Sequence, residues 1–434
     1  MRGRSLRSLA LTAAHDLFDQ STGIGRLALA HVAMMVGDTF VTVSLASSLF
    51  FSVSPTEAKG RVLAYLLFTI APFAVVSPIL GPLIDRSSNG RRILIAVSAG
   101  LRMVLCWEMS QHLNSLWLYP DAFAVLVASK LYVVTRGTLV PEMARSDQLR
   151  SPGSTDVGPA GWSPAPDTLE TGFAGFNAQL TLLGTVFGLV GGLVAAGILK
   201  SLGAPAVLLT ASVVYAGAML QSGRLPRPAA RARVEAAPLS QAERDLQALR
   251  PFGEAQLAWG LVAASLMRFA AGFTTFLLAF GLRREHAGLA WFAAALAVSG
   301  LGTLGGLSLV TRLRDRVREG LILTISLVAT SLGALVAGVT ATLVAQVLLA
   351  AWLGVWTAAA QPSFDAITQR LVAPGAQGRT FARFAVRQQL AWVVGAVIPV
   401  GVALSFATGD WLLSAVVALG AAAYVGGRHS TSPR

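Results

Sequence analysis

Charged residues and cysteines are both scarce in this sequence. Of its 434 residues, 13% are charged, and one, Cys106, is a cysteine. A soluble domain carries about a quarter charged residues, so the composition argues against an ordinary globular protein. A single cysteine excludes a disulfide within the chain, and no Cys/His spacing typical of a metal site occurs. We therefore expect neither a metal nor any other cofactor.

The sequence also lacks the motifs of an enzyme or of an ATP-driven pump. No G-x-x-x-x-G-K-[ST] phosphate-binding loop occurs, so ATP-driven transport would need another subunit. No nucleophile and base form a recognisable arrangement. The histidines are scattered: His15, His31, His112, His286 and His429. We accordingly expect no catalytic residues and predict that the protein is not an enzyme.

Hydrophobic residues, in contrast, make up 54% of the chain, and its mean hydropathy is +0.64. Runs of about 20 mostly apolar residues, long enough to cross a bilayer as helices, recur along the sequence. The strict alternation of a β-barrel is absent. The pattern predicts an all-α membrane protein with twelve transmembrane helices, near residues 27–52, 62–84, 92–111, 117–137, 177–199, 204–222, 256–280, 288–310, 320–338, 342–362, 386–407 and 411–426.

One short motif occurs twice at a constant interval. Residues 81–86 (Gly-Pro-Leu-Ile-Asp-Arg), followed by Gly90, recur 230 residues later as residues 311–316 (Thr-Arg-Leu-Arg-Asp-Arg), followed by Gly320. Internal duplication of this kind is typical of transporters, whose substrate sites lie near the bilayer midplane between the repeats. The duplication predicts two pseudo-symmetric bundles of six helices.

The expected domain boundaries follow from the breaks in the apolar pattern. The two bundles are residues 27–222 and 256–426, joined by a charged linker at 223–255. A flexible loop, rich in turn-forming residues, is expected at 145–167 within the first bundle. The remaining segments are an N-terminal segment, 1–26, and a tail, 427–434.

The distribution of the basic residues predicts the orientation of the chain. A net charge of +13 would suggest nucleic acid binding in a soluble protein. With the N-terminus inside, however, 25 of the 34 Lys and Arg fall in inner tails and loops, five in outer loops and four within spans. This is the positive-inside pattern, so both termini should be cytoplasmic, and a nucleic acid partner is disfavoured. Heavy use of arginine is typical of high-GC bacterial coding, so we expect a bacterial plasma membrane.

The repeated loop resembles the signature loop of the major facilitator superfamily. Residues 81–86, with Gly90-Arg91-Arg92, follow the second predicted span, and the weaker copy follows span eight, where that family repeats its motif. Residues 378–392 resemble the permeases of this family that are common in actinobacteria. The resemblance covers nearly the whole chain and implies a transporter of twelve helices. Four glycines of span five resemble the family's antiporter motif, but its proline is missing, so antiport is not implied: Gly184, Gly188, Gly191 and Gly192.

The resemblance also implies a conformational latch on the cytoplasmic side. In the family, the aspartate of the motif meets the N-terminus of helix eleven, where free N–H groups and the helix dipole favour an anion. We expect Asp85 to approach residues 382–383, and Asp315 to approach residues 173–177. The alternative is a simple turn flanked by positively charged membrane anchors. The latch residues would be Gly81, Asp85, Arg86, Gly90, Arg91, Arg92, Asp315 and Arg316.

Ionisable residues inside the predicted spans indicate a central polar site. Asp38 lies about eleven residues, or roughly 16 Å, into the first helix, where a carboxylate needs a cavity or a partner. Arg268, at the same 230-residue offset, and Lys130 have compatible depths. Asp38 is then either a proton- or substrate-linked switch or a permanent structural ion pair. The predicted site consists of Asp38, Lys130, Arg268, Arg387, Gln388 and Asp365.

Basic residues outnumber acidic ones in this site, which favours an anionic or zwitterionic substrate. Arg102 lies in a helix that is usually peripheral in the family, so we expect it to be structural or to snorkel toward the membrane surface.

The sequence predicts secondary active transport of a small organic solute by alternating access, with proton-coupled efflux as one form. A lipid-handling permease or flippase of the same fold is the alternative. It would be favoured by a cavity that opens sideways to lipid and has basic residues at the opening. A membrane-embedded enzyme or other non-transport protein is the third hypothesis. We expect a monomer whose partners are the substrate and the lipid bilayer.

Overall fold

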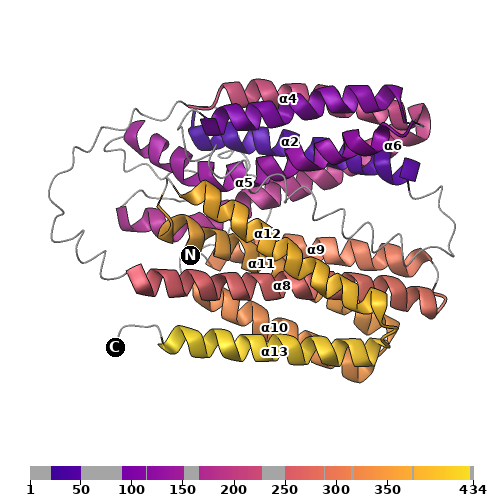
Figure 1. The fold of residues 1–434 in the computed structure, drawn as a ribbon, viewed down its shortest axis with the longest axis vertical. Coiled ribbons are helices and arrows are strands. Elements are labelled where there is room, and N and C mark those ends of the chain that lie inside the picture. Colours follow the sequence, from indigo (N-terminus) through magenta and orange to yellow (C-terminus); the bar gives the residue numbers. More distant parts are fainter. Residues whose placement is uncertain are drawn as a thin grey trace, which may run out of the picture.

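In the computed structural model, the described part of the chain is all-helical (Figure 1). It comprises residues 21–49, 90–113, 115–150, 166–226, 250–287, 289–313, 317–373 and 376–430. The helices within these ranges are α2 (Gly23–Leu49), α4 (Gly90–Gln111), α5 (Leu118–Arg150), α6 (Pro166–Gly223), α8 (Arg250–Arg284), α9 (Leu289–Leu313), α10 (Glu319–Thr340), α11 (Leu343–Leu371), α12 (Gln377–Gly401) and α13 (Phe406–Ser430). Each of these ten is long and apolar enough to cross a membrane.

Helix α6 contains two of the predicted spans. Its apolar part, Phe176–Gly223, has 48 residues. At 1.5 Å per residue this is about 70 Å of helix, more than twice the thickness of a hydrocarbon core. The helix is interrupted at Gly203, whose φ of 82° and ψ of 176° lie outside the helical region and suit a residue without a Cβ. The interruption falls between the predicted spans 177–199 and 204–222.

Eleven of the twelve predicted spans therefore fall on described helices, and the span at 62–84 lies outside the described residues. Several helices exceed their predicted limits, because hydropathy marks the bilayer rather than the end of a helix. For example, α12 begins nine residues before the predicted start at residue 386. The expected loop at 145–167 is also too wide, since α5 continues to Arg150 and α6 begins at Pro166.

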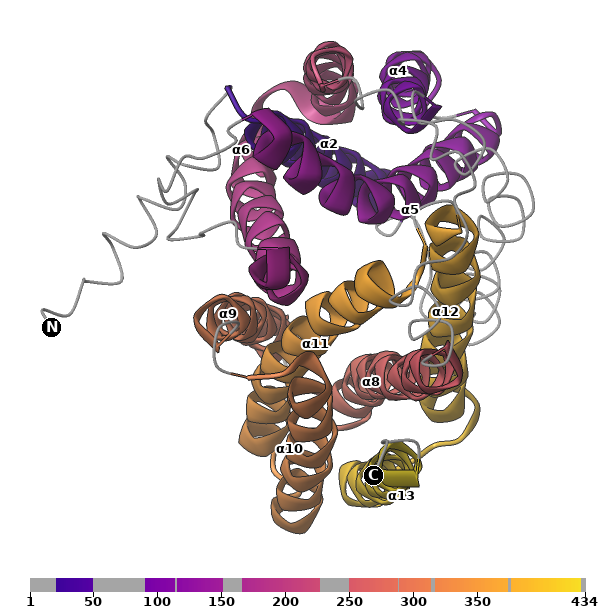
Figure 2. The same ribbon diagram turned by 90° about the vertical axis from the view of Figure 1, so that its left-hand side faces the viewer.

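The helices fall into two groups that correspond to the two halves of the sequence. Figures 1 and 2 show α2, α4, α5 and α6 together on one side and α8–α13 on the other. One large cluster of buried apolar side chains comes mainly from the first group, and a second comes from the second group. Helices α9, α11 and α12 of the second group contact α5 and α6 of the first. The groups therefore meet along a single junction.

Equivalent ion pairs join neighbouring helices in the two groups, with the charges reversed. Arg91 of α4 lies 3.0 Å from Glu142 of α5, and Glu319 of α10 lies 3.3 Å from Arg370 of α11. Each residue of the second pair follows its counterpart by 228 residues. The repeat seen in the sequence thus extends to a repeated contact between helices.

Candidate functional site

A cavity lies at the junction between the two groups of helices. Its volume is about 410 Å³, within the range of small-molecule sites, and it is lined by α5, α6, α8, α9, α11 and α12. On α5 the lining residues include 130, 133, 134 and 137, the spacing expected for one face of a helix. Both halves of the chain therefore contribute to one site.

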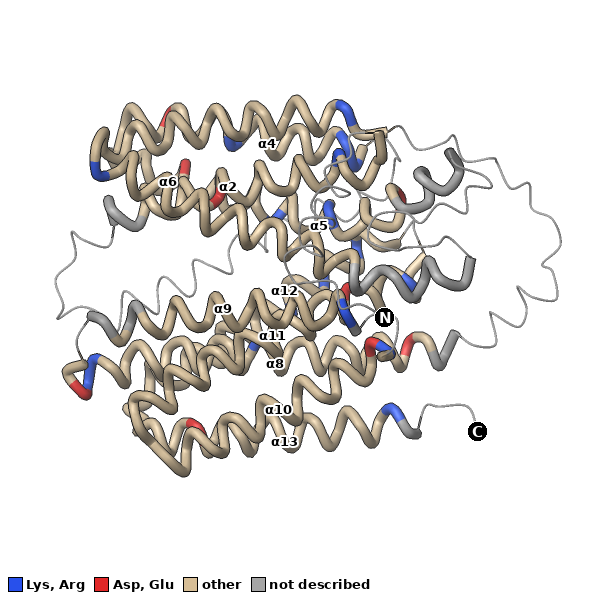
Figure 3. Tube along the Cα trace, turned by 180° about the vertical axis from the view of Figure 1, so that it is seen from behind, with Lys and Arg blue, Asp and Glu red and all other residues tan. Residues whose placement is uncertain are grey.

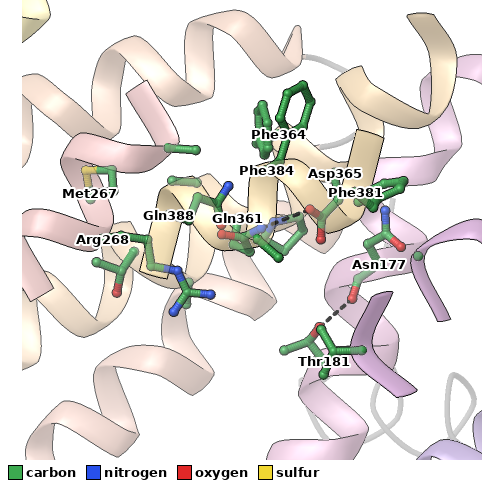
Figure 4. A pocket seen from close by; sticks show the side chains of 18 of the residues that line it. Asn177, Thr181, Met267, Arg268, Gln361, Phe364, Asp365, Phe381, Phe384 and Gln388 are labelled. Carbon is green, nitrogen blue, oxygen red and sulfur yellow. Dashed lines mark hydrogen bonds between the residues drawn. The ribbon is translucent and has the colours of Figure 1, made fainter. Parts of the chain in front are cut away.

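Basic side chains dominate the charge of this cavity. Among the described lining residues, Lys130, Arg136 and Arg268 are basic, and Asp365 is acidic. The amide of Gln361 donates a hydrogen bond of 2.9 Å to Asp365, and the Asp365 carboxylate also interacts through its charge with Arg136 and Arg268. In Figure 4, Arg268, Gln361 and Asp365 lie opposite Asn177 and Thr181. Four predicted site residues meet here: Lys130, Arg268, Asp365 and Gln388.

Arg136 is a cavity residue that was not among the predicted site residues. Its Nη1 lies 3.1 Å from Nε2 of His31, and Nδ1 of His31 lies 2.7 Å from the hydroxyl of Tyr132. His31 is 2% exposed and lies behind the cavity wall. The sequence signal for this region of the site is the helical spacing of the α5 residues that begin at Lys130. Nothing in the sequence indicates that Arg136 contacts His31.

Asp38 lies outside the lining of this cavity, in a polar cluster within the first half. Arg102 donates a hydrogen bond of 2.6 Å to Oδ1 of Asp38. Tyr215 donates another of 2.6 Å to the same atom, and Ser129 donates one of 3.2 Å to Oδ2. Lys130 interacts with Asp38 through its charge. The expected meeting of Asp38 and Arg268 is therefore replaced by contacts from α4, α5 and α6.

Of the two roles expected for Arg102, snorkelling toward the membrane surface is wrong, and a structural role fits its surroundings. Its side chain is completely buried, and it also donates hydrogen bonds to Ser98 and to the carbonyl of Ala128. The guanidinium lies over the rings of Tyr132 and Tyr215, at 5.6 and 5.2 Å from their centroids. Burial with a carboxylate and two aromatic rings explains how this charge is stabilised without reaching the membrane surface.

Arg387 does not line the central cavity, contrary to the prediction. It is exposed and lines a separate groove formed by α8, α12 and α13, whose other lining residues are nearly all apolar. Because successive residues of a helix are about 100° apart, the neighbouring Gln388 faces the cavity while Arg387 faces away from it.

Hydrogen bonds join the two halves beside Asn177 and Gly137, which line the cavity. Asn177 of α6 and Gln369 of α11 form a reciprocal amide pair, with distances of 2.8 and 3.4 Å. Gln369 also donates a hydrogen bond of 2.9 Å to the carbonyl of Gly137 on α5. Both Asn177 and Gln369 are buried. This amide pair and the side chain of Phe381, which packs beside Gly137, join the halves at this end of the cavity.

Most of the expected latch lies outside the described residues. This applies to Gly81, Asp85, Arg86, Asp315 and Arg316. Gly90 begins α4, and Arg91 pairs with Glu142 as described above. Arg92 donates a hydrogen bond of 2.8 Å to the carbonyl of Gly223, at the end of α6. These contacts hold the start of α4 against the rest of the first half.

Helices that cross a membrane many times around a polar cavity define a multi-pass membrane protein of the transporter class. The Major Facilitator Superfamily profile matches residues 161–396, just over half of the chain. The chain therefore belongs to the major facilitator superfamily. It is a secondary transporter and not an enzyme, as the sequence predicted.

The relatives in sequence are mycobacterial, consistent with the actinobacterial group. An uncharacterized protein of Mycobacterium leprae is 29% identical over 94% of this chain and 72% of its own length. An uncharacterized protein of Mycobacterium tuberculosis is 33% identical over 52% of this chain and 39% of its own length.

Solved structures of the same fold include several transporters. The fucose transporter FucP in its outward conformation has a TM-score of 0.65, with 13% identity over 94% of this chain and 98% of its own. A bacterial homologue of ferroportin, in an outward-facing state, has a TM-score of 0.62 with 14% identity, and covers 93% and 98%. The human organic anion transporter MFSD10 has a TM-score of 0.59 with 15% identity, and covers 94% and 99%. At these identities the likeness concerns the fold alone.

Proposed function

We propose that the protein transports a small organic anion by alternating access through the cavity between its halves. The proposal rests on an excess of positive charge among the described lining residues. Three of them are basic, Lys130, Arg136 and Arg268, and one, Asp365, is acidic. In a desolvated cavity such an excess of positive charge favours an anion strongly. The architecture we propose is two six-helix bundles, residues 27–222 and 256–426, in a bacterial plasma membrane.

The placement of the basic residues supports a substrate that bridges the halves. Lys130 and Arg136 belong to α5 of the first half, whereas Arg268 belongs to α8 of the second. A carboxylate between them would accept charge-assisted hydrogen bonds from both sides. It would also relieve repulsion between the two halves, so that closure around the substrate becomes easier than closure of the empty cavity.

Asp365 supports a coupling of this transport to protons. In its ionised form it competes with the substrate for Arg136 and Arg268, the charges that face it from α5 and α8. Gln361 donates to it from its own helix, and Asn177 and Gln388 contribute neutral amides from α6 and α12. Protonation removes the competing charge, so a proton and an anion bind together. Joint binding favours co-transport of proton and anion in the same direction over proton-coupled efflux, which the sequence analysis gave as one form of the function.

The closed end of the cavity supports an outward-facing state. Arg91 and Arg92 lie at the start of α4, and Figure 3 shows many Lys and Arg positions (blue) toward one end of the helices. By the positive-inside rule that end is cytoplasmic, which also gives cytoplasmic termini. The starts of α4 and α6 and the end of α11 lie toward this side, together with the Asn177–Gln369 pair. Closure there leaves access to the cavity from outside.

Uptake by proteoliposomes tests the proposed function. The probes are benzoate, 2-oxoglutarate and citrate, with tetraethylammonium and glucose as cationic and neutral comparisons. We expect carboxylate uptake that rises when the outside is made more acidic, and that falls at least tenfold in Arg136→Gln and Arg268→Gln, each of which removes one charge-assisted contact. Arg387→Gln is the matched control, because it removes an arginine that does not line the cavity. Transport of the cation alone would contradict the proposal.

The groove beside Arg387 favours lipid handling as the second candidate function. Arg387 is exposed there among apolar side chains of α8, α12 and α13, a setting that suits an anionic lipid. The same variants distinguish the two functions. If Arg387→Gln abolishes movement of a fluorescent phosphatidylglycerol between leaflets, while Arg136→Gln does not, the lipid function is correct and the soluble anion is not the substrate.

A further inference from the structure

The guanidinium of Arg136 is held from behind by a residue that does not line the cavity. His31 of α2 contacts Arg136 through Nε2 at 3.1 Å and Tyr132 through Nδ1 at 2.7 Å. Its ring also stacks on that of Tyr132, with centroids 5.9 Å apart and planes inclined by 18°. Because His31 and Tyr132 are both almost completely buried, the imidazole has a single, well-defined setting.

The hydrogen bonds assign a protonation state to the imidazole. A guanidinium can only donate, so Nε2 of His31 must accept from Arg136. The proton of the neutral ring is then on Nδ1, from which it is donated to the Tyr132 hydroxyl. This assignment rests on the contacts of the ring with Arg136 and Tyr132, beside which the backbone of Leu180 also interacts with the ring. In this form His31 accepts a hydrogen bond from one N–H of Arg136, and the other N–H groups of the guanidinium can point into the cavity.

A glycine of α6 makes room for this arrangement. A Cβ built on Gly184 would lie 2.6 Å from Nε2 of His31 and 2.7 Å from Cγ of Met35. Both distances are shorter than a van der Waals contact, and the His31 ring is fixed on its other side by Tyr132. Glycine at position 184 is therefore required for His31 to face Arg136. The glycine pattern noted in span five acquires a specific role at this position.

We propose that His31 is a positioning residue that orients Arg136 as the carboxylate-binding group of the first half, a role that rests on the proposed function. Arginine binds carboxylates through a planar fork of donors, and a fork fixed in advance loses less conformational freedom when it binds. Without His31, Arg136 is free to turn toward Asp365, with which it interacts electrostatically. Arg136 would then be partly neutralised by the protein's own carboxylate.

Substitution of His31 gives the first test, using the carboxylate of the panel above that is taken up fastest. His31→Leu removes the acceptor, and we expect the KM to rise about tenfold with kcat nearly unchanged, since Arg136 binds the anion before and during translocation. His31→Gln keeps an acceptor and should recover the KM to within about threefold of the wild type. A loss confined to kcat, or identical losses in both variants, would contradict positioning.

Gly184→Ala gives the second test without changing any polar group. The added methyl displaces the imidazole, so this variant should raise the KM as His31→Leu does. Gly197→Ala is the matched control on the same helix, because nothing lies within 4 Å of a Cβ there. Thermal unfolding of both variants shows whether they are folded. A folded Gly184→Ala protein with the wild-type KM would overturn the proposal.

Nitrogen NMR of labelled histidine reads the same contact without transport. The resonances of His31, assigned by their loss in His31→Gln, should report a neutral ring with the proton on Nδ1, and Arg136→Gln should shift Nε2. An unshifted Nε2 resonance would refute the contact.

The transport results distinguish failure of the anion site from failure of the positioning role of His31. If Arg136→Gln has no effect on uptake, the proposed anion site fails. If Arg136→Gln impairs uptake while His31→Leu does not, positioning alone fails.

Discussion

Asp38 and Asp365 are both carboxylates within membrane-spanning helices, but their surroundings favour different roles. Asp38 receives hydrogen bonds from Arg102, Tyr215 and Ser129, all from the first half of the chain. Asp365 has one hydrogen-bond donor, Gln361, and otherwise faces a cavity shared by both halves. A carboxylate held on several sides by one rigid unit suits a structural role. A carboxylate that faces the cavity, and so the path of the substrate, suits the coupling of transport to protons.

For Asp38 we predict that substitution lowers the stability of the protein and leaves the coupling of uptake to pH intact. Asp38→Asn leaves the completely buried Arg102 without its counter-charge, which costs on the order of 3–5 kcal/mol. Thermal unfolding in detergent should therefore shift strongly, and Asp38→Asn combined with Arg102→Leu should recover part of the loss. Protein that folds should keep the pH dependence of uptake. If that dependence disappears while stability is normal, Asp38 is the coupling residue that the sequence suggested.

For Asp365 we predict the opposite pattern. Asp365→Asn mimics the protonated carboxyl and removes the competitor for Arg136 and Arg268. Anion binding should become tighter and lose its dependence on pH, whereas the wild type should bind more tightly as the pH falls. The measurement is the KM for uptake at several pH values without a gradient. Unchanged pH dependence in this variant would exclude Asp365 as the site of proton competition.

At the level of single residues, the sequence did not predict which ionisable side chains contact one another. Asp38 and Arg268 share the 230-residue offset of the repeat, but equivalence under a repeat does not mean proximity. The partner of Asp38 is set by the rotation of α4, which brings Arg102 inward. The contact between Arg136 and His31 was not predicted, because it joins α5 to α2 and no local pattern in the sequence encodes it.

At the level of helices, α6 shows how backbone and packing features combine. Its break at Gly203 divides a long apolar segment into two, and four glycines of its first part face α2. A Cβ at any of them would come within 3.3 Å of an α2 side chain. The sequence predicted two separate spans here, 177–199 and 204–222, from apolar length. It could not predict that one of these glycines accommodates His31, since that depends on the register between the two helices.

The reversed ion pairs lead to a prediction about α4 and α5. In the second half, Glu319 lies at the start of α10 and Arg370 at the end of α11, where each charge is favourable to the helix dipole. Arg91, at the start of α4, has the less favourable sign. Glu142→Gln should therefore destabilise the protein, while the exchange Arg91→Glu with Glu142→Arg should restore wild-type thermal stability or exceed it.

Transport by the exchanged protein tests the latch independently of this pair. If the exchange restores stability but uptake stays low, Arg91 has a further role on the cytoplasmic side, as the family resemblance implies. If the exchanged protein is less stable than Glu142→Gln alone, the two ion pairs are not equivalent and the repeated contact is coincidental.

At the level of the whole molecule, function depends on how the two halves move. Each half has its own main apolar core, and the described hydrogen bonds between the halves gather at one end of the cavity. A smaller apolar cluster, to which Leu131 and Val134 of α5 and Phe381 of α12 belong, also joins the halves. Such an arrangement allows the halves to rock as units, because separating these contacts costs less than unpacking a main core. The amide pair of Asn177 and Gln369 is therefore positioned to set the balance between outward and inward states.

We predict that Gln369→Ala shifts this balance toward the inward-facing state. The variant loses both hydrogen bonds of the amide pair and the bond to the carbonyl of Gly137. At about 0.5–1.5 kcal/mol for each bond, the population should shift roughly tenfold or more.

The measurement is thiol labelling of a cysteine that replaces Thr303, a residue that lines the cavity on α9. The labelled protein carries serine in place of its native Cys106. A membrane-impermeant thiol reagent should label it readily from outside in the parent and much more slowly in Gln369→Ala. Gln111→Ala, an exposed glutamine at the end of α4, is the control and should label as the parent does. Equal labelling of all three proteins would mean that the contacts closing the cavity at rest lie elsewhere.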